Sequence, residues 1–229
     1  MEHRNVIEIK GLAKSFGKED LYKDFNLNIK KGDVHGLIGP NGSGKTTLLR
    51  LITSLYQLDS GSIKMDLKHS MLLENDYLYE EFSGRKNIEL FGQYFGYEGK
   101  KENYKRYSDL LELTEHLDKK VSNYSKGMKR KLSLLIVVMI GADIILLDEP
   151  TSGVDPISRV EIRSLVSELK KEGKTIIITS HDLSEIEKIA SRVTMIKSGN
   201  LIFDKDVNEF NGQTLEDLFL EVGKNEKKL

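Results

Sequence analysis

Cysteine is absent from the 229-residue sequence, so the chain has neither disulfide bonds nor thiolate metal sites. That absence fits a reducing compartment without establishing one. Long hydrophobic runs are also missing. The most apolar stretch, residues 132–147, contains Ser133, Gly141 and Asp143, and it falls short of the ~20 residues that a membrane-spanning helix needs. We therefore expect that the chain does not cross a bilayer by itself.

An excess of charge of either sign is missing as well. The 35 lysine and arginine residues nearly cancel the 36 aspartate and glutamate residues, which argues against binding to nucleic acid by electrostatics alone. No nucleic-acid partner is expected. Residues 1–10 lack the apolar run of a secretory signal. With 38% hydrophobic residues, the chain can form one large domain or one domain with an inserted lobe.

What the sequence does contain is a strong phosphate-binding motif. Residues 39–47, here called the P-loop, read GPNGSGKTT and match G-x-x-x-x-G-K-[ST] at every fixed position. A buried strand is predicted just before them, over residues 34–38, and a helix just after, over residues 46–55. The glycines let backbone N–H groups turn inward around an anion, and the helix directs its positive end to the same point.

The P-loop predicts a bound polyphosphate with Mg²⁺. Lys45 would supply a charge for the β- and γ-phosphates, and the Thr46 hydroxyl would ligate the Mg²⁺ that bridges them. A glycine-rich turn that only connects strand to helix is the alternative, but such a turn does not require Lys45-Thr46. The predicted ligand-binding residues are Gly39, Pro40, Asn41, Gly42, Ser43, Gly44, Lys45, Thr46 and Thr47.

The remaining pattern alternates strands and helices. Short apolar runs before the P-loop predict antiparallel strands, and later runs predict buried strands at 144–147 and 174–179 and a hairpin within 193–203. Helical spacing of apolar residues over 87–140 predicts an inserted lobe, interrupted by a polar linker at 99–103. The fold class is therefore α/β: a P-loop NTPase with a mainly parallel core sheet, an N-terminal antiparallel β subdomain and an inserted helical lobe.

We predict a single domain over residues 1–229. Its parts are a catalytic core at 1–75 and 143–210, a helical lobe at about 76–142, and a C-terminal helix and polar tail at 211–229. Residues 223–229 are predicted to be disordered. Asp155-Pro156 predicts the start of one helix, and Ser184 with Glu187 predicts a capping box at the start of another.

Carboxylates and a histidine follow the predicted core strands. Asp148 and Glu149 end the strand at 144–147, where an Asp can order Mg²⁺ and a neighbouring carboxylate can deprotonate an attacking water. A solvated strand end is the alternative. His181 follows the strand at 174–179 and is predicted to contact a γ-phosphate, although a lone histidine is more often structural.

Taken in order, these motifs resemble the nucleotide-binding subunit of an ATP-binding-cassette transporter over residues 6–210. The P-loop resembles that family's Walker A motif, residues 144–149 its Walker B motif, residues 125–128 its signature motif and residues 152–155 its D-loop. His181 resembles the switch histidine. Phe16 is similar to the aromatic residue that stacks on adenine, although from its spacing alone an ordinary half-buried turn aromatic is an equal interpretation.

The resemblance implies that two such domains close head to tail, with each ATP between Lys45 of one and Ser125 and Gly127 of the other. It also implies a place for Asp155 beside the nucleotide. Ser125 precedes a helical pattern, so a γ-phosphate would be favoured at that helix N-terminus. A plain helix cap is the alternative for Ser125.

The chain departs from the family pattern in two motifs. The usual Leu-Ser-Gly-Gly-Gln signature reads Tyr-Ser-Lys-Gly-Met at residues 124–128, which keeps the serine and the second glycine and changes the other three positions. The family's Q-loop glutamine is replaced by Glu74, which can ligate Mg²⁺ or accept a hydrogen bond from water. An exposed loop residue is the alternative for Glu74. Both departures resemble exporter-type subunits.

The expected function is ATP hydrolysis coupled to transport, with ATP and Mg²⁺ as cofactors. The predicted catalytic residues are Glu149, His181 and Lys45, and the predicted Mg²⁺ ligands are Thr46, Asp148 and Glu74. The resemblance implies two partners, a second ATP-binding subunit and a polytopic membrane permease, and a cytoplasmic location at the inner face of the membrane. A partner helix would contact the lobe near residues 74–85. A soluble cassette ATPase acting on a macromolecular complex and a P-loop kinase remain the alternatives.

Overall fold

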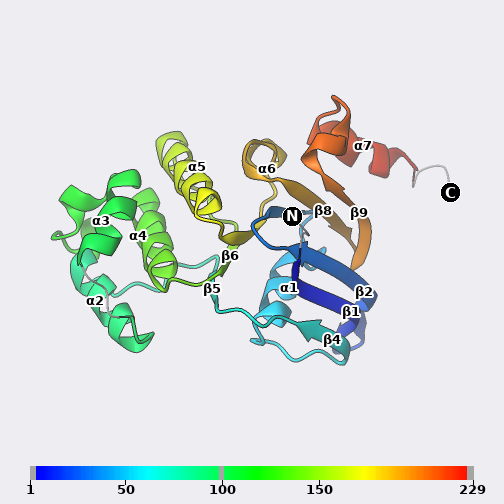
Figure 1. Ribbon diagram of the computed structural model, residues 1–229, viewed down its shortest axis with the longest axis horizontal. Coiled ribbons are helices and arrows are strands. Elements are labelled where there is room, and N and C mark those ends of the chain that lie inside the picture. The colour runs from blue at the N-terminus through cyan, green and yellow to red at the C-terminus, as the bar shows by residue number, and fades with distance from the viewer. Residues whose placement is uncertain (1–3, 98–100, 226–229) are drawn as a thin grey trace. The chain divides into compact units, whose positions relative to one another are not determined.

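The computed structural model describes residues 4–97 and 101–225. The chain divides into two compact units (Figure 1). Unit 1 consists of Met1–Leu67 and Thr175–Leu229, and unit 2 consists of Lys68–Lys174. The division of core from lobe at about residues 76 and 142 stays a prediction.

Unit 1 begins with an antiparallel sheet. Its strands are β1 (Asn5–Phe16), β2 (Glu19–Lys30) and β4 (Ser60–Lys64), in the order β2-β1-β4. Phe25, Leu27 and Ile29 are buried and alternate with exposed residues along β2, which is the period of a sheet with one covered face. The predicted antiparallel β subdomain is thus confirmed.

The second sheet of unit 1 positions the P-loop. It consists of β3 (Val34–Ile38), β7 (Thr175–Thr179), β8 (Arg192–Lys197) and β9 (Asn200–Asp206). β3 runs parallel to β7 on one side and to β8 on the other, and β8 and β9 form the predicted hairpin. Every residue of β3 and β7 is buried, as expected for parallel strands covered on both faces.

The helices of unit 1 are α1 (Lys45–Ile52), α6 (Leu183–Ile189) and α7 (Leu215–Asn225), with a 3₁₀ turn at Val207–Phe210. α6 packs so closely on β3 that a Cβ atom on Gly36 would lie 2.6 Å from the side chain of Ile186. This contact requires glycine at position 36.

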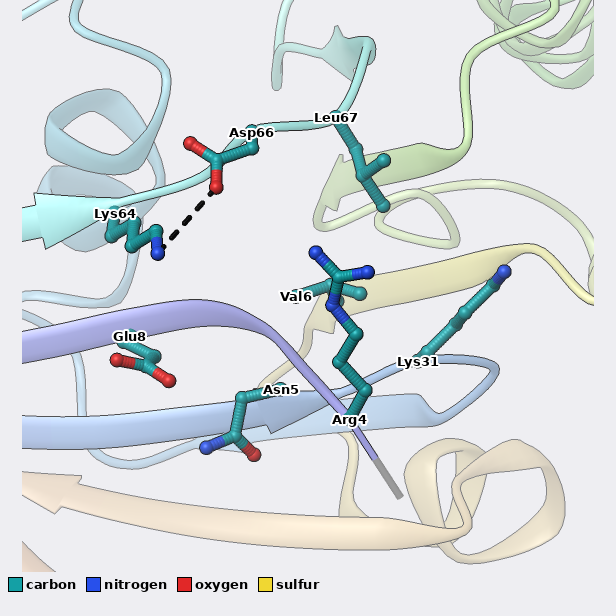
Figure 2. Close-up of a pocket in the computed structure, with 8 residues that line it drawn as sticks. All are labelled: Arg4, Asn5, Val6, Glu8, Lys31, Lys64, Asp66 and Leu67. Carbon is teal, nitrogen blue, oxygen red and sulfur yellow. Dashed lines mark ion pairs between the residues drawn. The ribbon is translucent and has the colours of Figure 1, made fainter. Parts of the chain in front are cut away.

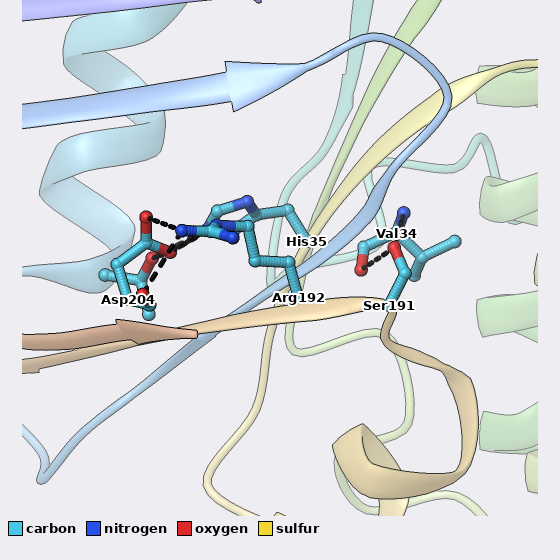
Figure 3. Close-up of polar contacts among 6 residues, drawn as sticks. Val34, His35, Ser191, Arg192 and Asp204 are labelled. Atoms are coloured by element: carbon cyan, nitrogen blue, oxygen red, sulfur yellow. Dashed lines mark hydrogen bonds and ion pairs between the residues drawn. The ribbon is translucent and has the colours of Figure 1, made fainter. Parts of the chain in front are cut away.

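A buried polar cluster joins three neighbouring strands of this sheet (Figure 3). His35 of β3 is fully buried, and its Nε2 atom donates to Thr194 Oγ1 at 2.7 Å, because that hydroxyl itself donates to Asp204 Oδ1 at 2.9 Å. Arg192 also donates to Asp204, at 2.8 Å from Nε. Burial lowers the pKa of His35 to about 4, so the ring is neutral at pH 7. The cluster holds β3, β8 and β9 in register.

Unit 2 contains a parallel strand pair and the helical lobe. β5 (His69–Leu72) pairs with β6 (Ile144–Asp148). The helices are α2 (Gly84–Tyr94), α3 (Lys101–Leu110), α4 (Lys126–Met139) and α5 (Pro156–Lys171), and 3₁₀ turns cover Thr114–His116 and Val121–Asn123. α4 is buried along most of its length and packs on α2, α3, α5 and β5. The predicted helical lobe is confirmed.

Three local predictions were wrong. Residues 101–103 of the predicted linker form the start of α3, because their polar sequence is compatible with a helix. Residues 98–100 lie outside the described residues. Residues 223–225 of the predicted tail belong to α7, and residues 226–229 are not described. Asp182, not Ser184, caps α6, because its carboxylate accepts from Glu185 N at 3.3 Å.

Over residues 4–97 and 101–225, no helix combines the length and the apolar character needed to cross a membrane.

Candidate functional site

The P-loop joins β3 to α1, as predicted. Gly39 (φ +151°) and Gly44 (φ +108°) adopt backbone conformations that favour glycine. A Cβ atom on Gly39 would lie 2.8 Å from Ser43 Oγ and would also collide with the carbonyl oxygen of Ile196, while one on Gly44 would collide with the hydroxyl of Tyr22. These two positions therefore exclude any larger residue.

The Lys45 side chain lies against the P-loop backbone. Its Nζ atom donates to the carbonyl oxygens of Gly39 at 2.8 Å and Pro40 at 3.1 Å, and the residue is only 7% exposed. Thr46 is next in the chain, on the first turn of α1, where its hydroxyl is near the helix N-terminus. A cation, a hydroxyl and the positive end of a helix thus share one loop, which is the chemistry that a phosphate group requires.

Phe16 lies at the end of β1 and is 47% exposed. Its ring makes an edge contact with Tyr56, with centroids 5.8 Å apart. The hydroxyl of Tyr56 accepts from Arg50 of α1 at 2.7 Å. Lys14, bound to Asp59 at 2.9 Å, lies 5.3 Å from the centre of the Phe16 ring. The exposed ring is therefore supported by contacts that lead back to the helix after the P-loop.

His181 follows β7 and is exposed. Leu37 of β3 pairs with Thr179 of β7, so the P-loop and His181 leave neighbouring parallel strands at the same edge. Ligands of open α/β sheets bind at this edge. Unit 1 thus brings together Phe16, the P-loop and His181 on one body.

Unit 2 carries the predicted acidic residues. Asp148 ends β6 and is fully buried, whereas Glu149 is partly exposed and has a left-handed backbone, with φ +48°. Glu74 is exposed and follows β5, and Leu72 of β5 pairs with Leu147 of β6. The three carboxylates therefore lie at the ends of two paired strands or just after them, at the same edge.

Oxygen donors of this kind fit Mg²⁺, which prefers hard oxygen ligands and usually keeps few of them from the protein. Thr46 and Asp148 are such donors, one on each unit. Within the described residues, no group of three or more His, Asp or Glu side chains could hold a metal ion by itself. Oxygen donors of this kind suit an ion whose remaining ligands are phosphate oxygens and water.

Ser125, Gly127 and Asp155 lie where two helices of unit 2 begin. Ser125 caps α4 by accepting from Met128 N at 3.1 Å, and Asp155 caps α5 by accepting from Ser158 N at 2.9 Å. The backbone N–H and the hydroxyl of Ser158 both donate to the Asp155 carboxylate, and these two bonds hold the pKa of Asp155 below its usual value. A Cβ atom on Gly127 would lie 2.7 Å from Asp155 Oδ2, so the approach of α4 to Asp155 requires glycine there.

The sequence analysis missed two residues, Tyr56 and Arg130. Arg130 lies on α4, is 3% exposed and hydrogen-bonds the turns that follow β5 and β6. No local signal marked Arg130 as buried, because it lies between Lys129 and Lys131, and a run of cations is typical of a solvated helix face. For Tyr56 no local pattern existed, because its contact with Phe16 spans the whole P-loop.

A cavity of about 220 Å³ lies elsewhere in unit 1 (Figure 2). Arg4, Lys31 and Lys64 line it together with Glu8 and Asp66, and Lys64 pairs with Asp66 at 3.7 Å. No residue of the P-loop contributes to it. Its charges of both signs favour no particular ligand.

Comparison with known proteins identifies relatives over most of the chain. The family model described as ABC transporter matches residues 22–152. The lantibiotic transport ATP-binding protein SrtF of Streptococcus pyogenes is 36% identical over 93% of this chain and 96% of its own length. The daunorubicin resistance ATP-binding protein DrrA2 of Streptomyces coeruleorubidus is 35% identical over 87% of this chain and 66% of its own length.

Solved structures have the same fold. The ATP-binding subunit of an ABC transporter superposes with a TM-score of 0.84 at 22% identity, covering 95% of this chain and 99% of that one. A dimeric ATP-binding cassette in a post-hydrolysis state, bound to ADP and Pi, superposes with a TM-score of 0.76 at 23% identity, covering 88% and 98%. The predicted resemblance and fold class are confirmed: the chain belongs to the ABC transporter family and has the fold of its ATP-binding cassettes.

Proposed function

We propose that this protein is the ATP-hydrolysing subunit of an ABC transporter that drives export through a separate membrane-spanning partner. The observation that carries the ATP chemistry is the P-loop, in which Lys45 is held inside a loop that excludes larger residues at Gly39 and Gly44. Support for transport comes from the relatives named for lantibiotic transport and daunorubicin resistance.

In the proposed nucleotide site, the P-loop amides and Lys45 bind the β- and γ-phosphates, and Phe16 stacks on the adenine. Thr46 and Asp148 would hold Mg²⁺, with Glu74 as a further oxygen donor. Bound Mg²⁺ would neutralise charge on the phosphates.

Glu149 accepts the proton of the attacking water, and His181 contacts the γ-phosphate. The left-handed backbone of Glu149 sets it apart from Asp148, which is buried in β6. Residues held in sparsely populated backbone conformations are frequent at active sites. The two neighbouring carboxylates thus have different surroundings and are assigned different roles, one toward the metal and one toward water.

The second nucleotide-facing surface belongs to a partner subunit, identical or not. In this proposal Ser125 and Gly127 of one subunit face the γ-phosphate bound to Lys45 of the other, and Asp155 lies beside them. Support comes from the position of Ser125 at the N-terminus of α4, where an anion is favoured. A cassette of the same fold has a dimeric structure in a post-hydrolysis state, bound to ADP and Pi.

The permease is proposed to dock on unit 2. A groove of about 220 Å³ follows β5 there, and its mostly apolar lining includes Leu72, Tyr77, Leu78, Phe91, Phe95 and Val137. Tyr77 is 67% exposed and Tyr79 is 54% exposed. An apolar side chain on a helix of the permease would fill the groove. Docking there would keep the subunit peripheral at the cytoplasmic face of the membrane.

Glu149→Gln tests the hydrolytic role. Gln keeps the shape but does not accept the proton, so phosphate release should fall by ~10²-fold or more while ATP stays bound. Release is measured as inorganic phosphate, with the nucleotide-bound fraction in parallel. Hydrolysis near the unmodified rate would remove Glu149 from this role, and a phosphorylated acceptor in place of free phosphate would favour a kinase.

A pull-down of the tagged chain from its native cells in mild detergent tests the transport role. A stoichiometric polytopic membrane protein that stimulates phosphate release is expected. Recovery of soluble machinery alone would leave the ATPase proposal standing and replace transport by action on a macromolecular complex.

A further inference from the structure

Arg130 is a buried cation in the interior of unit 2. It lies between Lys129, which pairs with Glu80 at 2.6 Å, and Lys131, which pairs with Glu161 at 2.6 Å. Arg130 differs from both, because most of its acceptors are main-chain carbonyl oxygens. A buried charge needs such compensation, since it has lost its contact with water.

The guanidinium group bonds two turns at once. Its Nη1 atom donates to the carbonyl oxygens of Leu73 at 2.7 Å and Glu74 at 3.1 Å, and to Asp76 Oδ1 at 3.1 Å. Its other nitrogens donate to three consecutive carbonyls at the end of β6 and just after it: Asp148 at 2.6 Å and Glu149 at 3.0 Å from Nη2, and Pro150 at 3.2 Å from Nε. The first turn carries Glu74, and the second begins after Asp148 and carries Glu149.

The second turn needs an external support. Glu149 has φ +48°, which is unfavourable for a residue with a Cβ atom. Arg130 donates to the carbonyl oxygens of both Glu149 and Pro150. Because the guanidinium group is planar and rigid, these bonds fix the orientation of the backbone at Glu149. Lysine has one nitrogen in place of three and does not reproduce this geometry.

We propose that Arg130 is a positioning residue for hydrolysis: it fixes the turn that carries Glu149 relative to the turn that carries Glu74. The proposal rests on the proposed role of Glu149 toward water. Arg130 itself acts only through the backbone of these turns. Since a misplacement of about 1 Å can cost ~10²-fold in rate, loss of this support should lower the rate of hydrolysis far more than the affinity for nucleotide.

The test compares Arg130→Lys with Lys129→Met in the full-length protein. Lys129→Met is the matched control, because it removes a neighbouring cation whose partner, Glu80, is exposed. Arg130→Lys should lower kcat for phosphate release by ~10- to 100-fold and leave the Kd for ATP within about twofold. Lys129→Met should change neither.

A double-mutant cycle with Glu149→Gln separates positioning from general stability. If Arg130 acts through Glu149, Arg130→Lys should cause no further loss of kcat in the Glu149→Gln background. An equal fractional loss in both backgrounds would overturn the proposal. Should Arg130→Lys fail to fold, Asp76→Asn weakens the same cluster without removing the guanidinium group and should give a smaller loss of the same kind.

Amide hydrogen exchange gives a readout that does not need hydrolysis. Peptides covering residues 73–79 and 148–153 should both exchange faster in Arg130→Lys and stay unchanged in Lys129→Met. If exchange were unchanged in Arg130→Lys, Arg130 would not hold the two turns. If exchange were faster but kcat were unchanged, holding the turns would have no effect on hydrolysis. If the unmodified protein released no phosphate, the proposed function would fail and the positioning role with it, while coupled exchange would still show that Arg130 joins the two turns.

Discussion

Lys45 is held by carbonyl oxygens of its own loop, so its charge is already in place for a phosphate ligand. Lys45→Ala should therefore weaken nucleotide binding itself. Charge-assisted hydrogen bonds contribute about 1.5–3 kcal/mol, which corresponds to a Kd for ATP raised ~10- to 100-fold. Titration with ATP measures the change, and Lys64→Ala is the control, because Lys64 is an exposed lysine of the same unit. Equal affinity in both variants would contradict the predicted role.

His35 predicts how stability depends on pH. Burial lowers the pKa of His35 to about 4, so between pH 4 and its ordinary pKa of about 6.5 the unfolded chain binds more protons than the folded one. The stabilising effect of the neutral ring is full above about pH 6.5 and is lost as pH falls toward 4. Over this pH range the neutral His35 ring contributes about 3 kcal/mol to the free energy of unfolding.

Urea unfolding between pH 4 and pH 7 measures this dependence. His35→Gln keeps an N–H donor for Thr194 but does not titrate, so the slope of unfolding free energy with pH should be smaller in this variant. An unchanged slope would assign the pH dependence to other groups.

At the scale of elements, local patterns predicted most of the strands and helices. Continuous apolar runs located β6 and β7, as is typical of strands covered on both faces, and β3 was predicted from the mostly apolar segment that leads into the P-loop. The predicted cap of α6 was wrong because only the folded backbone shows that the carboxylate of Asp182, two residues before Ser184, reaches Glu185 N. The P-loop was predictable because all its parts are adjacent in sequence.

Contacts between distant segments were not predictable in this way. Arg130 meets Leu73 across 57 positions, and nothing in either segment alone indicates the other. The edge contact between Phe16 and Tyr56 likewise joins the end of β1 to the segment after α1. Residues that act alone in a motif can be found from sequence, whereas residues that support others need the fold.

The contact between Tyr56 and Phe16 gives a prediction about base recognition. Tyr56 contacts the exposed Phe16 ring and accepts a hydrogen bond from Arg50 of α1. Tyr56→Leu should therefore leave the Phe16 ring less ordered. ATP binding should weaken ~3- to 10-fold, which is the range expected for the loss of one aromatic pair. Binding of inorganic tripolyphosphate, which has no base, should be unchanged. Tyr56→Phe keeps the ring and should retain most of the affinity. An equal loss for both ligands would assign Tyr56 to the P-loop instead.

At the scale of the whole molecule, the predicted site residues are divided between the units. Unit 1 carries the residues proposed to bind nucleotide, and unit 2 carries the carboxylates together with Ser125, Gly127 and Asp155. Substitutions in unit 1 are therefore expected to act mainly on affinity, and substitutions in unit 2 mainly on turnover and assembly.

The exposed tyrosines of unit 2 give the prediction for assembly. Replacement of Tyr77 and Tyr79 by Ala together should reduce recovery of the membrane partner in the pull-down and its stimulation of phosphate release, because Tyr77 lines the apolar groove and Tyr79, two residues later in the chain, is an exposed aromatic side chain. Binding of ATP should stay unchanged. Tyr94→Ala is the control, since Tyr94 is 83% exposed and does not line the groove. Unchanged recruitment would exclude this surface as the docking site.

The order of the units along the chain has a consequence for synthesis on the ribosome. β3 lies between β7 and β8, and both of these strands are translated after the whole of unit 2. The apolar strand that precedes the P-loop must therefore wait, unpaired, while more than a hundred residues are added, and unit 2, which is continuous, can fold first. The ability to bind nucleotide is thus acquired only near the end of translation, so a nascent chain released early would carry the P-loop sequence without its fold.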